Sequence, residues 1–346
     1  MYPTNEFPVF GVFVKNLEIL LEKRGVEIIS KSYIKGRRSS IKKFLAYVKF
    51  YISIIKSFFT RNIDFYYIHF PLQSSLIINF LLLFFNKKII LNIHGSELSE
   101  KSFFYNSFLK LLKKVDLIIV PSSFYKNLLC KSFQIIDAKI FVYPSGGVNQ
   151  AVFKPLNKSD LRTKYKLDNN FFICSYISSI IKEKGWETFY LASQILIEKN
   201  TNIHFVVVGN GADERIFKAK VSNNNLTSYY TFFDRAEQSV LPEFFNLSDL
   251  FIFPTHKESL GLVGLEALSC GIPVLASHIG ATQQYIEEGK NGYLFELKNE
   301  KELAEKINIV WKKDNLKLLK ENALLSSIKF ESEFCTNLLL EKLKEI

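Results

Sequence analysis

The chain has 346 residues and a mass of 40.1 kDa, and a chain of this size predicts two domains rather than one hydrophobic core. Its 48% hydrophobic and 23% charged residues exclude wholesale disorder. The net charge is +11, and residues 1–150 carry all of the excess, with 21 Lys and Arg against 9 Asp and Glu. This asymmetry indicates an anionic partner for the first half: a membrane surface, a nucleic acid or a phosphorylated substrate.

The compartment can be predicted from cysteines and apolar stretches. The four cysteines match neither a disulfide framework nor a zinc site, which favours a reducing cytosol; they are Cys130, Cys174, Cys270 and Cys335. No secretory signal is expected, because Glu6 and two prolines interrupt the opening residues. The longest apolar stretch, 65–85, contains several polar residues, so we expect a core segment there rather than a membrane span.

The first half of the chain alternates helical and strand-like segments. Residues 15–24 have helical spacing, and three short apolar runs predict strands at 64–69, 88–94 and 116–121. A parallel sheet of this kind usually opens with an apolar strand, and here it is missing. We expect either that the sheet lacks this strand or that the true start lies upstream. The Gly- and Pro-rich segment 143–155 is the expected linker between domains.

The second half repeats the pattern more clearly. Buried strands are predicted at 171–178, 203–208, 229–233, 250–254 and 273–277, and helices at 186–198, 240–247, 263–270 and 281–288. Strands that alternate with helices indicate doubly wound parallel sheets, in which ligands bind beyond the carboxyl ends of the strands. We therefore expect an α/β protein with a first domain at 1–150, a second at 151–325, and a C-terminal helix at 326–346 that packs back toward the first.

The most specific motif carries two carboxylates around one helix start. Glu258 lies in the loop after a predicted strand and Glu266 in the following helix, with Gly261 and Leu262 between them. A helix N-terminus offers free N–H groups and a positive dipole end, which suit a diphosphate. A carboxylate further along the helix can accept hydrogen bonds from a vicinal diol such as a ribose. A helix with one N-terminal Glu and one surface Glu is the simpler interpretation.

This block, followed by Gly271-Ile272-Pro273-Val274, resembles the Glu-x7-Glu signature of glycosyltransferase family 4, the retaining group 1 enzymes of polysaccharide and lipopolysaccharide biosynthesis. The resemblance implies the GT-B fold, in which two Rossmann-like domains face each other across a cleft. It also implies that Glu258 contacts the transferred sugar and Glu266 the ribose of a nucleotide-sugar donor.

Other segments resemble the same family in the same order. Gly11 matches the loop that approaches the donor phosphates, and His94 the histidine beside the transferred sugar. Lys184 matches the lysine that holds the diphosphate, and Ser179 stands where the family usually has an arginine. Gly209 and Gly211 match a turn beside the nucleobase. Without the resemblance, Gly11 is a turn glycine, His94 a structural histidine and Lys184 a solvated lysine.

The reaction implied by the resemblance needs no cofactor besides the donor. Helix dipoles, backbone N–H groups and Lys184 can stabilise a departing diphosphate, and the sequence has no Asp-x-Asp motif, so a metal is not expected. The acceptor is expected to be a glycan or a lipid-linked glycan in capsule, O-antigen or exopolysaccharide synthesis.

Residues 31–61 form a basic segment in which aromatic and aliphatic residues alternate with Lys and Arg and no acid occurs. This pattern fits an anionic membrane surface and would place the enzyme as a peripheral protein on the cytoplasmic face of the cell membrane. A core-packed helix with a solvated basic rim explains the same residues.

Two other classes of function remain open. A sugar-nucleotide hydrolase or epimerase can have the same architecture, and a non-catalytic binder of membrane or nucleic acid would explain the basic half. The sequence contains no recognisable nucleic-acid module, so a nucleic-acid partner is not expected.

Overall fold

The structure is a computed structural model that describes residues 2, 11–35, 40–99, 102–199, 202–312 and 316–346. The chain divides into two compact units. Unit 1 consists of residues 1–146 and 335–346, and unit 2 of residues 147–334. The boundary at Gly146 lies within the segment predicted as the linker, and the end of the C-terminal helix belongs to unit 1.

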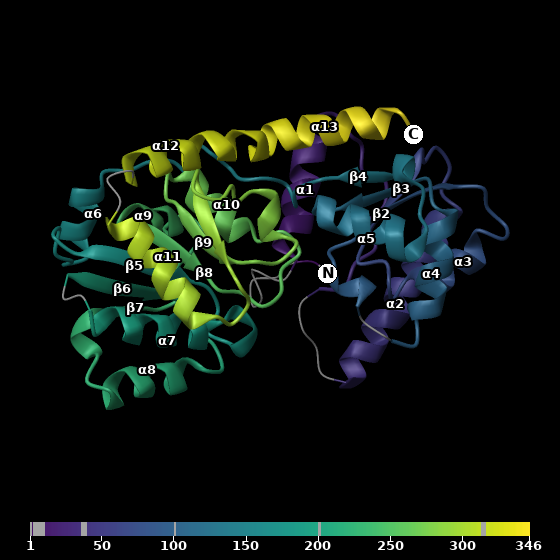
Figure 1. Ribbon diagram of the computed structural model, residues 1–346. Helices are drawn as coiled ribbons and strands as arrows, with labels where there is room; N and C mark the ends of the chain where they lie inside the picture. Colours follow the sequence, from purple (N-terminus) through teal and green to yellow (C-terminus); the bar gives the residue numbers. More distant parts are fainter. Residues whose placement is uncertain (1, 3–10, 36–39, 100–101, 200–201, 313–315) are drawn as a thin grey trace. The chain divides into compact units, whose positions relative to one another are not determined.

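Unit 1 contains an open parallel sheet in the order β1-β2-β3-β4 (Figure 1). Its strands are β1 (Phe65–His69), β2 (Lys88–Asn92), β3 (Leu117–Val120) and β4 (Ile140–Val142). Its helices are α1 (Val12–Lys23), α2 (Ser40–Phe58), α3 (Ser75–Leu81), α4 (Tyr105–Lys114) and α5 (Ser123–Phe133), with α13 (Ser332–Lys344) returning at the end of the chain.

Helices cover both faces of this sheet, because alternate strand residues face opposite sides. On one face, Ile89, Leu91 and Ile118 pack against α2, α3, α4 and α5. On the other face, Ile90 and Ile119 pack with apolar residues of α1 and α13. The predicted doubly wound arrangement of the first half is therefore confirmed.

Unit 2 contains a six-stranded parallel sheet in the order β10-β9-β8-β5-β6-β7. Its strands are β5 (Phe172–Ile177), β6 (Ile203–Val208), β7 (Tyr230–Phe233), β8 (Leu250–Phe253), β9 (Val274–Ser277) and β10 (Gly292–Phe295). Its helices are α6 (Lys158–Lys164), α7 (Trp186–Ile197), α8 (Glu214–Asn223), α9 (Leu241–Asn246), α10 (Leu262–Ser269), α11 (Glu300–Lys312) and α12 (Leu316–Ser327).

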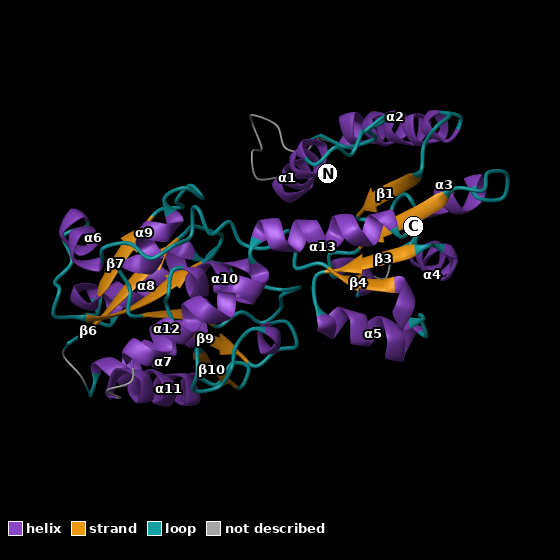
Figure 2. Cartoon of the chain, turned by 90° about the horizontal axis from the view of Figure 1, so that it is seen from above, coloured by secondary structure: helices purple, strands orange, loops and turns teal. Residues whose placement is uncertain are grey.

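The sheet of unit 2 also has a core on each face, and helices lie on both sides of it in Figure 2. Cys174 and Tyr176 of β5 face α7, α8 and α11, whereas Ile173 and Ile177 face α9 and α10. All six residues of β5 and of β6 are buried. Near-continuous burial explains why these strands read as unbroken apolar runs in the sequence.

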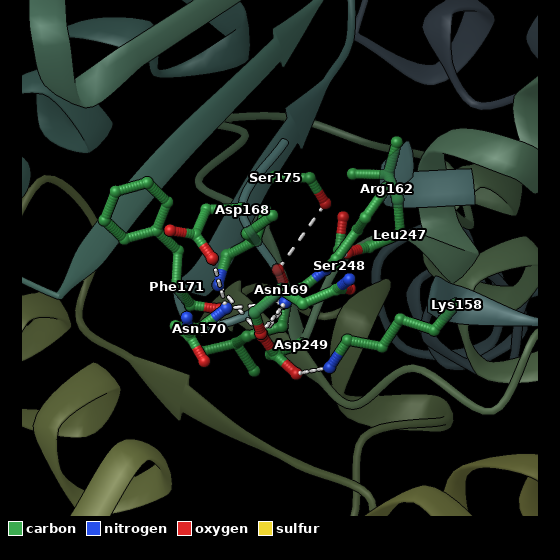
Figure 3. Close-up of polar contacts among 12 residues, drawn as sticks. Lys158, Arg162, Asp168, Asn169, Asn170, Phe171, Ser175, Leu247, Ser248 and Asp249 are labelled. Atoms are coloured by element: carbon green, nitrogen blue, oxygen red, sulfur yellow. Dashed lines mark hydrogen bonds and ion pairs between the residues drawn. The ribbon is translucent and has the colours of Figure 1, made fainter. Parts of the chain in front are cut away.

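The strand order of unit 2 reverses between β5 and β8, and a buried ion pair fixes these two strands at their amino ends (Figure 3). The Arg162 guanidinium of α6 donates to the Asp249 carboxylate at 2.8 Å and to the carbonyls of Leu247, Asn169 and Phe171. Asp249, directly before β8, also accepts from the backbone N–H of Ile173 in β5 at 2.9 Å. This network aligns β5 and β8, so that their carboxyl ends lie together at the other end of the sheet.

One predicted helix in unit 2 is wrong. Residues 281–288 were expected to be helical, but only Thr282–Gln284 form a short 3-10 turn. Side chains replace the helical hydrogen bonds there: Asn291 donates to the Tyr285 carbonyl at 2.7 Å and accepts from the Glu287 N–H at 2.8 Å. Across the described ranges, no helix has the length and apolar character needed to cross a membrane.

Candidate functional site

The carboxyl ends of β5 and β8 meet at the point where the strand order reverses, which is where open α/β sheets bind ligands. The loop after β5 and the loop after β8 are held together by hydrogen bonds. The backbone N–H of His256 donates to the Glu183 carbonyl at 2.8 Å, and the Thr255 hydroxyl donates to the same carbonyl at 3.4 Å. These contacts place Lys184 and Glu258, which are 74 positions apart in the chain, next to each other.

Lys184 and Glu258 form an ion pair between Nζ and Oε1. Both side chains are partly exposed, at 27% and 17%, so a ligand can still reach them. The arrangement offers a cation that can hold a phosphate and, beside it, a carboxylate that can accept hydrogen bonds from a hydroxyl-rich group. The structure therefore brings together these two predicted site residues.

Two glycines allow the site loops to approach their neighbours closely. Gly185, directly after Lys184, has φ +70°, and a Cβ there would lie 1.8 Å from the Pro254 carbonyl oxygen at the end of β8. Gly261, with φ +83°, precedes the first turn of α10, and a Cβ there would lie 2.7 Å from the Phe253 ring. Only glycine fits both the backbone conformation and the space at these positions.

The amino end of α10 rests on a buried tyrosine that the sequence analysis did not identify. The Tyr285 hydroxyl donates to the Gly261 carbonyl at 3.3 Å, and its ring lies against Gly264. Burial, and then the nearby charge of Glu258, raise the pKa of Tyr285 well above its usual value, so the phenol stays protonated. Leu262 is the first residue of α10, and the free N–H groups of this turn lie next to the loop that carries Glu258.

Glu266 lies in the second turn of α10, in an environment that disfavours its charge. Burial raises its pKa to about 7, and a hydrogen bond from the Gln238 side chain opposes the rise. Carboxylates whose pKa is raised by burial are frequent at functional sites. Gln238 lies 28 positions earlier in the chain, so no local motif links it to Glu266.

The turn after β6 packs against the loop after β5. Cβ atoms on Gly209 and Gly211 would lie 2.0 Å from the Ser178 carbonyl oxygen and 2.3 Å from the Ile180 carbonyl oxygen. The backbone N–H of Ile180 donates to the Asn210 carbonyl at 2.9 Å. Ser179 is exposed in this loop, and its carbonyl accepts from the Tyr176 hydroxyl at 3.2 Å. Both glycines thus shape the same edge of the sheet as Lys184.

In unit 1, His94 follows β2 and contacts a second histidine at the end of β1. Nε2 of His94 lies 3.2 Å from Nδ1 of His69, and the Phe70 ring stacks on His94 with 4.2 Å between ring centroids. Burial lowers the pKa of His94 to about 3 and, together with the neighbouring His94, lowers that of His69. Both imidazoles are therefore neutral at pH 7. His69 was not predicted as a site residue, although it ends an apolar strand and His94 closely follows one.

The loop after His94 is fixed by Glu97. The buried Glu97 carboxylate accepts from the His94 N–H at 3.1 Å, and burial raises its pKa. Gly11 adopts φ +73° immediately before α1 and is buried. The residues directly before Gly11 lie outside the described ranges. Gly11 and His94 belong to unit 1, and the other predicted site residues belong to unit 2.

The basic segment 31–61 contains α2, whose outer face is apolar. Ile41, Phe44, Val48 and Ile52 form an exposed stripe at helical spacing, and the Phe44 side chain is 68% exposed. Lys42, Lys49 and Lys56 follow at seven-residue spacing and are exposed along one flank of the stripe. Arg37 and Arg38, part of the same predicted segment, lie outside the described residues.

The apolar stripe of α2 continues onto α3. A small hollow of about 360 Å³ separates the end of α2 from α3 and is lined only by apolar side chains; they are Ile55, Phe59, Ile77, Phe80, Leu81, Phe84 and Phe85. The side chains of Phe80, Leu83 and Phe84 around it are more than half exposed. We name the stripe of α2, together with Phe80 of α3 and Leu83 and Phe84 just after α3, the apolar patch.

Comparisons with known proteins identify related sequences and folds. Residues 157–323 match the family described as Glycosyl transferases group 1, and residues 13–146 match Glycosyltransferase Family 4. The capsular polysaccharide biosynthesis glycosyltransferase CapM of Staphylococcus aureus is 26% identical over 276 residues, which cover 74% of this chain and 69% of that protein.

Solved structures share the fold across nearly the whole chain. Sucrose-phosphate synthase from Thermosynechococcus elongatus superposes with a TM-score of 0.79, at 19% identity, over 96% of this chain and 92% of the other. Anabaena HepE, in a complex with UDP-glucose, superposes with a TM-score of 0.73, at 17% identity, over 95% of this chain and 89% of the other.

Proposed function

Because the chain belongs to glycosyltransferase family 4, of the group 1 type with the GT-B fold, and is a transferase, we propose that it moves a sugar from a nucleotide-diphosphate sugar to a glycan or lipid-linked acceptor. CapM, a capsular polysaccharide glycosyltransferase, supports a role in surface polysaccharide synthesis. HepE, whose structure contains UDP-glucose, supports a nucleotide sugar as the donor. The observation that carries the proposal is the pair of Lys184 and Glu258 at the reversal point of the unit 2 sheet.

We propose that unit 2 binds the donor. Lys184 and the first turn of α10 hold the diphosphate, because a cation and free N–H groups stabilise the negative charge that grows as the leaving group departs. Glu258 accepts hydrogen bonds from sugar hydroxyls, and Glu266 accepts them from the ribose. Gly209 and Gly211 keep the edge beside the nucleobase open.

We propose that unit 1 supplies the acceptor side through His94. A neutral imidazole can exchange a hydrogen bond without carrying a charge, and we assign His94 to contact with the transferred sugar. His69 fixes the ring of His94 through the 3.2 Å contact. No step requires a metal ion, and the anomeric configuration of the sugar is retained.

The donor-binding proposal is tested by a thermal-shift screen of the purified protein against a panel of nucleotide sugars. One donor should raise the melting temperature of the wild type and of Glu287→Ala, in which an exposed ion pair with Lys290 is lost. The same donor should give a smaller shift with Glu266→Ala. Equal shifts for Glu266→Ala and the control would refute the assigned site.

A hydrolase or epimerase is the second candidate. The assay that separates the classes follows the donor in the presence and absence of a glycan acceptor. A transferase links the sugar to the acceptor and consumes little donor alone. Release of free sugar, or conversion to an epimer at equal rate without acceptor, would favour the second candidate.

We also propose that the apolar patch and the lysines of α2 bind an anionic membrane on its cytoplasmic side. The exposed stripe can enter the headgroup region, while the lysine flank contacts anionic lipids. In a sedimentation assay, vesicles with anionic lipid should retain the wild type, and both Phe44→Ser and the triple change Lys42→Glu, Lys49→Glu and Lys56→Glu should reduce binding. Lys290→Glu, in unit 2, is the control. Equal sedimentation of all four proteins would exclude this surface.

A further inference from the structure

Tyr285 packs against the start of α10, where two glycines leave room for its side chain. A Cβ on Gly264 would lie 2.5 Å from the Tyr285 hydroxyl oxygen and 3.0 Å from two of its ring carbons, and a Cβ on Gly261 would lie 3.0 Å from the same oxygen. Gly264 is the third residue of α10, a position where alanine favours a helix more than glycine does. The space that Tyr285 occupies therefore explains a glycine that the helix itself does not require.

The Tyr285 hydroxyl also bonds to the residue at which α10 begins. The Gly261 carbonyl oxygen accepts from the Gly264 N–H at 2.9 Å, which closes the first turn, and from the Tyr285 hydroxyl at 3.3 Å. The Phe253 ring at the end of β8 borders Gly261 as well, since a Cβ there would lie 2.7 Å from it. Tyr285 thus contacts the first turn of α10 with its ring and bonds to it with its hydroxyl.

The position of Tyr285 is set by buried partners inside unit 2. Its backbone N–H donates to the Thr282 carbonyl at 3.3 Å, and its carbonyl accepts from the Asn291 side chain at 2.7 Å. Asn291 also donates to the Ser326 hydroxyl of α12 at 2.8 Å. Because Tyr285, Asn291 and Thr282 are all buried, the interior of the domain fixes where the phenol meets α10.

We propose that Tyr285 is a positioning residue for sugar transfer, and that it holds the first turn of α10 and the loop from Glu258 to Gly261 in the geometry that the transition state requires. The inference rests on the proposed function and adds a residue to it. The free N–H groups at a helix start stabilise a leaving group only when they point at it from hydrogen-bond distance. A displacement of about 1 Å can lower a rate about 100-fold, so Tyr285 affects the reaction without touching the donor.

The first test removes the hydroxyl alone, in Tyr285→Phe. Turnover at saturating donor should fall about 5- to 10-fold, in line with the loss of one hydrogen bond, while KM for the donor should change less than about twofold. The matched control is Tyr190→Phe, because Tyr190 is also a buried tyrosine of unit 2 and its hydroxyl donates to the Lys220 carbonyl at 3.2 Å. Both variants should lose similar stability in urea, but the control should keep wild-type turnover.

Two outcomes of this test separate the role of Tyr285 from the proposed function. If the wild type transfers sugar, and Tyr285→Phe and Tyr190→Phe have equal turnover, the positioning role is overturned and the proposed function stands. If the wild type transfers no sugar from any donor of the nucleotide-sugar panel, the proposed function is overturned, and the role of Tyr285 with it.

The second test measures whether Tyr285 and α10 act on each other. Gly264→Ala places a Cβ 2.5 Å from the Tyr285 hydroxyl oxygen, so the ring or the helix start must move, and turnover should fall at least about 10-fold. In the Tyr285→Phe background that oxygen is absent and the closest ring carbons lie at 3.0 Å, so the same change should have a smaller effect.

The double variant Gly264→Ala and Tyr285→Phe should therefore keep at least about three times the turnover expected from multiplying the two separate losses. All turnover is measured below the unfolding transition of each variant, which separates a displaced site from an unfolded protein. Separate losses that simply multiply would show that the phenol and the start of α10 act independently, and would overturn the proposal.

Discussion

The imidazoles of His69 and His94 lie in hydrogen-bond contact, with 3.2 Å between Nδ1 of the first and Nε2 of the second. Because burial lowers the pKa of both groups, one ring donates its proton to the contact and the other accepts. The pair therefore fixes the orientation of the His94 ring.

We predict that His69→Phe lowers turnover about 5- to 10-fold, because it keeps an aromatic ring but removes a hydrogen bond worth about 1 kcal/mol. The affinity for the donor, which we propose that unit 2 binds, should not change. Steady-state kinetics and a direct donor titration separate these quantities. His278→Phe, at an exposed position of unit 2, is the control. A loss of donor affinity equal to the loss of turnover would show that His69 acts on the whole fold rather than on His94.

The two histidines also predict how stability depends on pH. Their folded-state pKa values lie below the usual 6.5, with His94 at about 3. The folded protein therefore binds fewer protons than the unfolded chain in this range, and stability falls as the pH drops below about 6.5. Thermal melts of the double variant His69→Phe and His94→Phe between pH 4 and 7 should show a weaker decline than those of the wild type. An unchanged decline would assign it to other groups.

Removal of Lys184 and removal of Glu258 should affect different steps of the reaction. Lys184→Ala removes the cation expected to bind the diphosphate, and should weaken donor binding roughly 10- to 100-fold, in line with about 1.5–3 kcal/mol for a hydrogen bond to a charged group. Glu258→Ala should mainly reduce turnover, by at least about 100-fold. Calorimetric titration of the donor and single-turnover kinetics measure the two effects, and Lys290→Ala is the surface control. The reverse distribution of effects would exchange the two assigned roles.

Glu266 should make donor binding pH-dependent near neutrality. Its pKa is about 7, and only the carboxylate can accept from both ribose hydroxyls, so donor affinity should fall as the pH drops from 8 to 6. In Glu266→Gln the affinity should be lower at pH 8 but nearly independent of pH. Titrations at several pH values test this; a wild-type affinity that is constant from pH 6 to 8 would contradict it.

The same residue should lower the stability of the free protein. Its folded-state pKa lies above the ordinary value of 4.5, so the folded protein binds more protons than the unfolded chain, and stability falls as the pH rises from about 4.5 to 7. Glu266→Gln removes this loss and should melt at a higher temperature than the wild type at pH 8. A lower melting temperature would show that the charge is stabilised in a way that burial alone does not describe.

The sequence predicted the strands of unit 2 closely because buried parallel strands are unbroken apolar runs. The strand predicted at 203–208 has those bounds in the structure, and 250–254 differs from β8 by one residue. β4 and β10 were not predicted, since strands of three and four residues at a sheet edge carry little pattern. The helix predicted at 281–288 is wrong because the Tyr285 carbonyl and the Glu287 N–H bond to the side chain of Asn291. Asn291 lies outside the predicted segment, so helical spacing within 281–288 could not reveal it.

The spacing of site residues could be read directly only within one segment, whereas Lys184, Gly209 and Gly211 were predicted from the family resemblance. Glu258, Gly261 and Glu266 belong to one strand–loop–helix motif, so their spacing could be read directly. Gln238 and Tyr285 reach Glu266 and Gly261 from other parts of the chain, through contacts that only the tertiary fold creates. The Lys184–Glu258 pair depends on the reversal of strand order, which pairs β5 with β8 although β6 and β7 lie between them in sequence.

The close approach of the loops after β5 and β8 can be tested with two glycines that share a backbone conformation but differ in surroundings. Gly185 and Gly25 have φ values of +70° and +85°. A Cβ at Gly185 would lie 1.8 Å from the Pro254 carbonyl oxygen, whereas none of the neighbours of Gly25 comes within 4 Å. Gly25→Ala should therefore lower the free energy of unfolding only by the strain of a left-handed alanine, about 1–2 kcal/mol.

Gly185→Ala adds a backbone clash to that strain. It should therefore lower the free energy of unfolding by at least about 1–3 kcal/mol more than Gly25→Ala does. Since it pushes the β5 loop away from Pro254, it should also separate Lys184 from Glu258 and reduce donor affinity in the protein that still folds. Urea unfolding gives the free energies, and donor titration below the unfolding transition gives the affinity. If both alanine variants lost equal stability and bound the donor equally well, the two loops would not depend on close contact at Gly185, and the geometry assigned to the site would be wrong.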